Sequence, residues 1–370
     1  MNLALFLTSG TSLKLWKERG WLDGGSGIKT YNAWSKHFNI IYFISYGGSD
    51  DLRYQTFLNH NIRVLPKKIA LPSWLYCFLI PFIYRKELKN CDLYTTTQME
   101  GAWSAAIAKK LYGKKFILRC GYQWGLSLFG KGFKGWFGKF IAPFLERFTY
   151  KMADYNIVTS HFAKEHINKT YGISLETIDV IPNPVDTTLF KPKDVPRPEN
   201  SLVYVGRLEK EKNPLILLEA LIGLNIKLTI FGSGTLEPEL RAFSIKNKID
   251  VDFRGNVPTH ILAKEINNHE IFVAPSLYEN SPKALFEAMS SGLVIVGTNV
   301  RGINEIITHQ KNGILCDPTP SSIHDAIIKI IGNKQLRETL KINARQYALA
   351  NFDLTYKITK DLEIFHKVLS

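Results

Sequence analysis

Short apolar runs alternate with amphipathic stretches along the 370 residues of this chain. Runs of this kind, bounded by polar and turn residues, are typical of buried strands, and the stretches between them have helical spacing. The alternation predicts an α/β fold with parallel sheets, because helices then cover both faces of each sheet. We expect strands near residues 2–8, 40–45, 62–65, 92–96, 115–119, 155–159 and 178–181, and then near 201–206, 226–231, 250–254, 271–274, 293–297 and 313–316.

The pattern divides into two halves. Asn183-Pro184 and the proline-rich stretch 191–198 interrupt it, as linkers between domains do. Each half is long enough to bury a core of its own. We therefore expect a first domain over residues 1–185, a second over 186–352, and a last helix over 353–370.

Positive charge is concentrated in the first half. Residues 1–185 contain 24 Lys and Arg against 12 Asp and Glu, whereas residues 186–370 contain 23 against 21. Such an asymmetry indicates an anionic partner for the first half. A nucleic acid is not expected, because no recognised nucleic-acid motif occurs and the basic residues are interleaved with apolar ones. An anionic membrane surface fits better.

Two segments bear on the membrane hypothesis. Residues 72–86 are mostly apolar but contain Pro81, and they are too short to span a bilayer, which needs about 20 residues. Residues 126–151 interleave aromatic residues with cations, which suits the interfacial zone of an anionic leaflet. A core helix with solvated lysines would have the same periodicity, so spacing does not decide between these two interpretations. The aromatic residues are Phe129, Phe133, Trp136, Phe137, Phe140, Phe144 and Phe148, and the cations are Lys131, Lys134, Lys139, Arg147 and Lys151.

The cysteines and the first residues favour the cytoplasm. Cys77, Cys91, Cys120 and Cys316 have no metal-ligand spacing, which is typical of reduced thiols. The chain begins with an apolar run that lacks the basic lead of a signal peptide and is predicted to be a strand. We expect a cytoplasmic protein that lies peripherally on the inner face of the membrane.

The segment from Glu279 to Glu287 carries the strongest chemical signal. Ser281 is a good helix N-cap and Pro282 a favoured first helical residue, so we expect a helix to begin there, directly after a strand. Its first-turn N–H groups and Lys283 then form an anion site at the carboxyl end of a parallel strand. The two glutamates suit sugar hydroxyls rather than phosphate. The alternative is a helix with two surface glutamates.

Further motifs accompany this segment in a fixed order. They are Ile181-Pro182-Asn183-Pro184-Val185-Asp186, Val205-Gly206-Arg207-Leu208 with Lys212, Phe231-Gly232-Ser233-Gly234, and Phe253-Arg254-Gly255-Asn256-Val257-Pro258. Together with the two glutamates, which are separated by seven residues, they resemble the group 1 glycosyltransferases of family 4. The resemblance is dense in the second half of the chain and covers the first half only in outline.

The resemblance implies the GT-B fold, in which two Rossmann-like α/β domains with parallel sheets face each other across a cleft. It implies a retaining, metal-independent enzyme that needs no cofactor and uses a nucleotide-sugar as substrate, a UDP-sugar rather than a GDP-sugar. The first domain would take a lipid-linked or glycan acceptor at the cytosolic membrane face, in cell-surface polysaccharide or glycolipid assembly. The last helix would cross back onto the first domain.

The resemblance also assigns roles to single residues. Arg207 and Lys212 would neutralise the leaving diphosphate, and Glu279 would lie at the donor sugar, so these three are the catalytic candidates. Glu287 would bind the ribose hydroxyls. The donor-binding candidates are Gly25, Gly206, Gly232, Gly234, Val257, Asn280, Ser281, Lys283, Ala284, Leu285 and Glu287.

The first half offers four acceptor or phosphate candidates. Gly24 belongs to the glycine-rich stretch 23–27, which is expected between the first strand and the first helix and is either a ligand loop or an ordinary turn. Many relatives carry a histidine after the fifth strand, but no histidine occurs there in this chain, so Arg119 and Tyr122 are the candidates. His161 is either an acceptor contact or a surface histidine beside a helix start.

Three other interpretations bear on the reaction. Asp250-Val251-Asp252 spells the motif with which glycosyltransferases of another fold hold a divalent ion, but the resemblance makes both acids structural, and we expect no metal. A nucleotide-sugar epimerase of GT-B build and a catalytically silent, membrane-associated binding protein stay as alternatives. A dehydrogenase is not expected, because no G-x-G-x-x-G follows the first strand.

Overall fold

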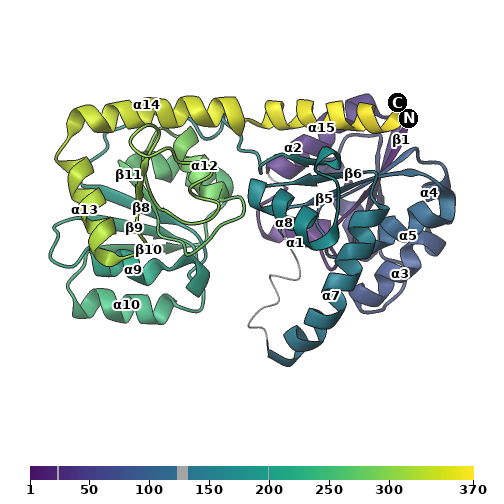
Figure 1. Ribbon diagram of the computed structural model, residues 1–370, viewed down its shortest axis with the longest axis horizontal. Helices are drawn as coiled ribbons and strands as arrows, with labels where there is room; N and C mark the ends of the chain where they lie inside the picture. The colour runs from purple at the N-terminus through teal and green to yellow at the C-terminus, as the bar shows by residue number, and fades with distance from the viewer. Residues whose placement is uncertain (23–24, 123–131, 199) are drawn as a thin grey trace. The chain divides into compact units, whose positions relative to one another are not determined.

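The computed structural model describes residues 1–22, 25–122, 132–198 and 200–370, with the backbone alone for 132–140. The chain forms two compact units, one of residues 1–182 with 357–370 and one of residues 183–356 (Figure 1). Gly24 lies outside the described residues, as do Phe129 and Lys131 of the expected membrane segment.

The first unit contains a parallel sheet of seven strands in the order β3-β2-β1-β4-β5-β6-β7. All seven expected strands are confirmed, since each apolar run supplies one strand of a sheet that is covered on both faces. Their bounds are β1 (Asn2–Phe6), β2 (Ile40–Ile44), β3 (Ile62–Leu65), β4 (Leu93–Thr96), β5 (Lys115–Cys120), β6 (Tyr155–Val158) and β7 (Ile178–Val180).

The helices of the first unit include one that was not expected. Helix α1 (Leu13–Glu18) lies between β1 and the glycine-rich stretch, so that stretch precedes the second helix, not the first. The buried carboxylate of Asp51 accepts hydrogen bonds from Leu13 N and Lys14 N, which satisfies the free amides of its first turn. In the described residues before β7, the other α-helices are α2 (Ser26–Trp34), α3 (Ser73–Ile83), α4 (Arg85–Lys89), α5 (Trp103–Tyr112), α7 (Gly132–Met152) and α8 (His161–Tyr171).

Most of the last helix, α15 (Leu354–Leu369), belongs to the first unit from Lys357 onward. Phe365 packs edge to face on Trp34, with ring centroids 5.0 Å apart, and it belongs to the core of the first unit. Asp361 is buried and pairs with both Lys357 and Arg119. Apolar packing and a cluster of buried ion pairs thus fix this helix against the first unit.

The second unit contains a parallel sheet of six strands in the order β10-β9-β8-β11-β12-β13. All six expected strands are confirmed, and the expected helical end of the chain is confirmed as well. The strands are β8 (Ser201–Val205), β9 (Lys227–Phe231), β10 (Val251–Gly255), β11 (Ile271–Ala274), β12 (Val294–Thr298) and β13 (Ile314–Cys316).

Helices cover both faces of this second sheet. Helices α9 (Pro214–Ala220), α10 (Glu237–Lys246) and α13 (Pro320–Ile331) bury apolar side chains in one core cluster. Helices α11 (Thr259–Glu265), α12 (Lys283–Ser290) and α14 (Lys334–Asn351) contribute to the cluster on the other face. The chain therefore builds two doubly wound α/β units.

Candidate functional site

The strand order of the second sheet reverses between β8 and β11. In doubly wound sheets, ligands bind outside the carboxyl ends of the strands at such a reversal. The loop after β8 carries Arg207 and Lys212, and the loop after β11 carries Glu279. The topology therefore brings together the three residues that the sequence singled out as catalytic candidates.

An ion pair joins these two loops. Lys212 Nζ lies 2.5 Å from Glu279 Oε1, and the two side chains are only 21% and 12% exposed. Ser276 Oγ donates a second hydrogen bond to the same carboxylate oxygen at 2.9 Å. Because both charges are largely withdrawn from water, each depends on the other for its stabilisation.

Arg207 is held differently. Its guanidinium is 67% exposed and pairs with Glu211 at 2.6 Å, a surface contact of small energetic weight. Its carbonyl oxygen, in contrast, accepts a hydrogen bond from the buried Tyr204 hydroxyl at 2.9 Å. The backbone of Arg207 is therefore fixed, and its charged end can turn toward an anion at little cost.

Helix α12 begins two residues after Ser281, so the expected cap is wrong. Pro282 is the N-cap and Lys283 the first helical residue, while Ser281 Oγ accepts a hydrogen bond from Asn183 N at 3.0 Å. Within the described chain, the amides of Lys283 and Ala284 have no hydrogen-bond acceptor. Two free amides and the positive end of the helix dipole form a site for an anion.

Two polar groups of this segment are buried beside the anion site. Glu287 is buried, and burial raises the pKa of its carboxyl group although Lys283 Nζ, 3.3 Å away, opposes the shift. The side-chain oxygen of Asn280 is buried and accepts no hydrogen bond from the described residues. A buried acceptor without a donor is costly, so a ligand that donates here would relieve that cost.

Close packing between the loops explains the glycines of the site. Gly232 has a φ of 135°, and a Cβ at this position would lie 1.9 Å from the carbonyl oxygen of Gly206. A Cβ on Gly234 would lie 2.3 Å from Leu208 O. These loops approach one another so closely that only glycine fits. Val257 packs against the apolar cluster beneath them, and Leu285 is part of that cluster.

The sequence did not single out three residues that hold this arrangement. Ser276 and Tyr204 fix Glu279 and Arg207, and no pattern in the sequence marks either of them. Gly302, with a φ of 83°, lies against Glu279 so closely that a Cβ would come within 2.1 Å of Glu279 O. The pair Arg301-Gly302 was the available signal, since a glycine after a strand often permits a close approach.

The first-unit candidates are not brought together in this way. The side chain of Arg119 is 11% exposed, and its guanidinium pairs with Asp361 at 3.3 Å and donates a hydrogen bond to Ile181 O at 3.3 Å. Gly25 is the N-cap of α2, where a Cβ would lie 2.2 Å from Trp21 O. Burial raises the pKa of the Tyr122 hydroxyl, and His161 is the exposed first residue of α8.

The two acids of the D-x-D motif are apart from this site. Asp252 pairs with Arg254 at 2.7 Å, and Asp250 is exposed just before β10. No group of three or more metal-ligating side chains occurs in the described ranges.

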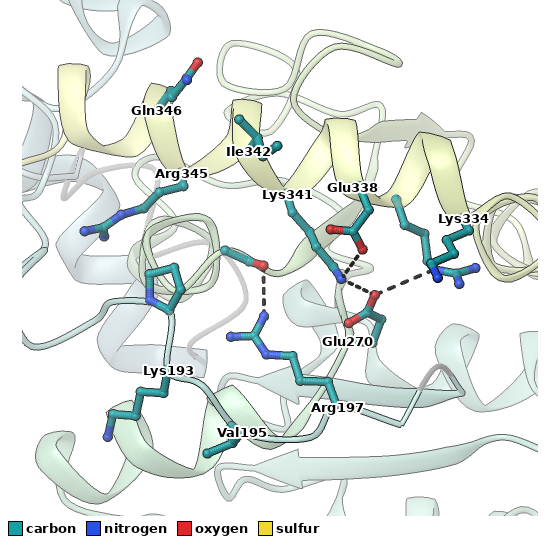
Figure 2. Close-up of a pocket in the computed structure, with 13 residues that line it drawn as sticks. Lys193, Val195, Arg197, Glu270, Lys334, Glu338, Lys341, Ile342, Arg345 and Gln346 are labelled. Carbon is teal, nitrogen blue, oxygen red and sulfur yellow. Dashed lines mark hydrogen bonds and ion pairs between the residues drawn. The ribbon is translucent and has the colours of Figure 1, made fainter.

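A cavity of about 680 Å³ opens at the other, amino-terminal edge of the second sheet (Figure 2). Its lining has six Lys and Arg residues against two acids, Glu270 and Glu338, and Glu270 contacts Lys341 at 2.5 Å and Arg337 at 3.6 Å. Arg197 donates to Gly292 O and Ser291 O, the carbonyls that end α12. We assign this cavity a structural role, because the strand reversal directs ligands to the opposite edge.

Arg345 supports the same end of α12. It donates hydrogen bonds to Ser290 O at 2.5 Å and Phe190 O at 2.9 Å. Figure 2 shows Arg197 and Arg345 among the side chains that line the cavity. The amino end of α12 thus faces the candidate site, and two guanidinium groups hold its carboxyl end.

Two family models match successive parts of the chain. The model described as Glycosyltransferase Family 4 matches residues 35–189, and the model described as Glycosyl transferases group 1 matches residues 185–347. The chain belongs to the group 1 glycosyltransferases of family 4. The second model contains the loops after β8 and β11 with Arg207, Lys212 and Glu279.

Similar proteins agree with this assignment. A UDP-Gal:alpha-D-GlcNAc-diphosphoundecaprenol alpha-1,3-galactosyltransferase of Escherichia coli is 28% identical over 252 residues, which are 61% of this chain and 64% of that protein. One component of the phosphatidylinositol N-acetylglucosaminyltransferase of Arabidopsis thaliana is 30% identical over 195 residues, 50% of this chain and 43% of that protein. The chain thus matches less than two thirds of the length of each.

A solved structure has the same fold as this chain. The crystal structure of Anabaena Alr3699/HepE in complex with UDP superimposes with a TM-score of 0.78 at 16% identity, over 99% of this chain and 100% of that protein. This family 4 protein therefore has the expected GT-B fold of two α/β units with parallel sheets.

Proposed function

We propose that this family 4 protein is a retaining glycosyltransferase that moves a sugar from a UDP-sugar to a lipid-linked or glycan acceptor. The observation that supports it best is the Lys212–Glu279 pair at the strand reversal, beside the free amides of α12. A cation, an acid and a helix start at one strand reversal suit a donor that carries a diphosphate and a sugar.

The diphosphate is the group on which charge develops as the glycosidic bond breaks. We propose that Arg207 and Lys212 stabilise this charge, together with the amides of Lys283 and Ala284. Arg207 can leave Glu211 at little cost, because that pair is exposed. Lys212 stays next to Glu279, so the cation is placed before the donor arrives.

The two glutamates would then hold the hydroxyl groups of the donor. Glu287 is buried in α12 beside Lys283, where we propose a ribose contact, and Glu279, paired with Lys212, is proposed to contact the transferred sugar. The choice of UDP over GDP is supported by the name of the E. coli relative and by the UDP complex of the Anabaena protein. The retaining outcome, through front-side displacement assisted by the leaving diphosphate, is part of this proposal and is what the resemblance to the family implies.

We further propose that the acceptor is linked to a lipid at the cytosolic face of a membrane, in cell-surface polysaccharide or glycolipid assembly. The names of both relatives contain a lipid, diphosphoundecaprenol in one and phosphatidylinositol in the other. The excess of positive charge in residues 1–185 also suits an anionic lipid surface. In the described part of the chain, no helix has the length and apolar character that crossing a bilayer requires.

Metal independence is part of this proposal. Arg207, Lys212 and Lys283 each pair with a glutamate in this structure, and we propose that these cations stabilise the diphosphate as a divalent ion does in other glycosyltransferases. Asp252 is engaged by Arg254, so the D-x-D motif offers no ready ligand pair.

Binding and transfer assays test the proposal in sequence. Calorimetry with UDP, GDP and UDP-sugars should show a UDP preference, and Lys212→Met should bind UDP at least about tenfold more weakly. Lys311→Met, at an exposed position outside the site, is the matched control. Transfer is then measured with UDP-sugars and diphosphoundecaprenol-linked N-acetylglucosamine, with the anomer assigned by NMR. A donor that is epimerised without acceptor, or that is bound but never transferred, would refute the proposal.

A further inference from the structure

Helix α3 is apolar on its inner face, as a core helix should be. Tyr76, Cys77 and Ile80 are buried in the core of the first unit. Two hydrogen bonds fasten the helix to α5: Ser104 Oγ donates to Cys77 O, and Tyr112 OH donates to Pro81 O, each at 2.7 Å. Figure 1 shows α3 beside α5.

The outer face of α3 is equally apolar but lies in solvent. Trp74 and Phe82 are each 60% exposed, Phe78 is 39% exposed and Leu75 is 38% exposed. Trp74, Phe78 and Phe82 follow one another at four-residue steps, so they form one stripe along the helix. A helix that is apolar all round is normally buried all round, and an exposed stripe of large side chains indicates an interaction surface.

Cations surround this stripe. Between residues 67 and 89 the chain has five basic residues and a single acid, Glu87. Lys68 before α3, and Arg85, Lys86 and Lys89 in α4 after it, are exposed. Aromatic side chains bordered by lysine and arginine are typical of segments that lie at the boundary between lipid headgroups and acyl chains.

We propose that the outer face of α3 is the surface on which this protein docks to an anionic lipid bilayer. The 11 residues of α3 make a helix about 16 Å long, so it lies in the plane of the interface rather than across it. Trp74, Phe78 and Phe82 enter the acyl boundary, and the cations contact headgroups. The role of this surface in the reaction depends on the proposed lipid-linked acceptor. The surface itself is inferred from the exposed apolar side chains of α3 and the cations around them.

The stripe differs from the segment that the sequence favoured for membrane contact, residues 126–151. Residues 126–131 lie outside the described part of the chain, and the side chains of 132–140 are not described. In the rest of α7, Phe148 packs against the core and Phe144 is exposed. Among the described side chains, those of α3 therefore form the better docking surface.

A second copy of this chain fits the stripe less well than a bilayer does. In a symmetric dimer the same patch of both copies would meet. The four exposed cations of one copy would then face those of the other, and only Glu87 of each copy could oppose them. An anionic leaflet instead contributes a negative charge near every cation, and each such contact strengthens binding about fivefold, the equivalent of about 1 kcal/mol.

Vesicle sedimentation without any donor tests the apolar stripe. Trp74→Glu/Phe82→Glu should bind vesicles of phosphatidylcholine and phosphatidylserine about 100-fold more weakly than the wild type. The matched control is Ile245→Glu/Ile342→Glu, which changes two exposed apolar residues of the second unit, 79% and 56% exposed. This control should bind like the wild type.

A charge variant keeps the test valid should the double glutamate variant fail to fold. Arg85→Glu/Lys86→Glu places acids in the first turn of α4, where the helix dipole favours them. This variant should lose most of its binding to vesicles that contain phosphatidylserine. Its control is Lys311→Glu/Lys334→Glu, at exposed positions of the second unit, which should keep most of the vesicle binding of the wild type. The proposal would be overturned if Trp74→Glu/Phe82→Glu and Arg85→Glu/Lys86→Glu bound vesicles as well as their controls do. It would also be overturned if the wild type were a dimer that Trp74→Glu/Phe82→Glu converts to a monomer without any loss of vesicle binding.

The outcome is separable from that of the proposed function. UDP binding and transfer to a short-chain, water-soluble acceptor should be the same in Trp74→Glu/Phe82→Glu and in the wild type. If neither the wild type nor the variant transfers a sugar but only the wild type binds vesicles, the docking surface is supported and the proposed reaction is refuted. If both proteins transfer a sugar and bind vesicles equally well, only the docking surface is refuted.

Discussion

Replacing Lys212 by methionine separates the structural from the catalytic part of its role. The change keeps the length of the side chain and removes the charge that lies 2.5 Å from Glu279. At an effective dielectric constant of about 20, two unit charges at this distance attract by about 7 kcal/mol. Desolvation of both groups offsets most of that attraction. Since the Glu279 carboxylate keeps the Ser276 hydroxyl, we expect a net loss of about 2 kcal/mol in the free energy of unfolding.

Arg207→Met is the natural comparison. Its partner Glu211 is an exposed contact, so the loss of stability should stay below about 0.5 kcal/mol. Both variants should nevertheless lose several kcal/mol of transition-state stabilisation, measured as kcat/KM for transfer, because both cations are proposed to stabilise the leaving diphosphate. We therefore expect similar losses of kcat/KM in the two variants but a larger loss of unfolding free energy in Lys212→Met.

The assay must report on the second unit. All seven tryptophans precede residue 140, so tryptophan fluorescence follows the first unit only. Hydrogen exchange in urea, read by mass spectrometry for peptides that contain β8 and β11, gives the stability of the second unit. The double variant Lys212→Met/Glu279→Gln should regain most of the lost stability and none of the activity. If Lys212→Met leaves the exchange of both peptides unchanged, the ion pair does not join the two loops and the reasoning is wrong.

Three further predictions concern the same site. Burial raises the pKa of Glu287, so the folded chain holds a proton that the unfolded chain releases, and this stabilising contribution is lost as the pH rises through the folded-state pKa. The melting temperature of Glu287→Gln should therefore rise relative to that of the wild type as the pH increases above 4.5, the ordinary pKa of the carboxyl group, and a constant difference would contradict the assigned burial. Transfer in excess EDTA should stay within a factor of about three, whereas complete loss restored by magnesium or manganese would return Asp250 and Asp252 to consideration. Gly232→Ala should lower the stability of the second unit by at least about 2 kcal/mol because its Cβ meets Gly206 O, and a soluble variant of unchanged melting temperature would argue against that packing.

The strands were predictable because each is a local apolar run in a sheet buried on both faces. Their order was not, since the position of β8 between β9 and β11 depends on contacts between distant segments. For the same reason the sequence indicated Lys212 and Glu279 separately and gave no sign that they pair across 67 positions.

Two features that the local patterns do not indicate have a common physical cause. Ser281 has the local features of an N-cap, but its hydroxyl is engaged by the amide of Asn183, which is 98 positions away in the chain. Arg119 has the features of a phosphate ligand, but the last helix brings Asp361 to it. In both cases a tertiary contact overrides a local preference, and no single-sequence pattern reports such a contact.

The two guanidinium groups at the carboxyl end of α12 have an electrostatic effect at its other end. Helix α12 has eight residues and is about 12 Å long. Arg197 and Arg345 neutralise the negative pole of its dipole, so the positive pole at Lys283 acts on an anion without the opposing field of its own tail. The strength with which the anion site attracts an anion is thus set partly by two side chains at the opposite end of α12. Substitutions at the carboxyl end of this helix can therefore change the affinity for an anion without changing any residue that contacts it.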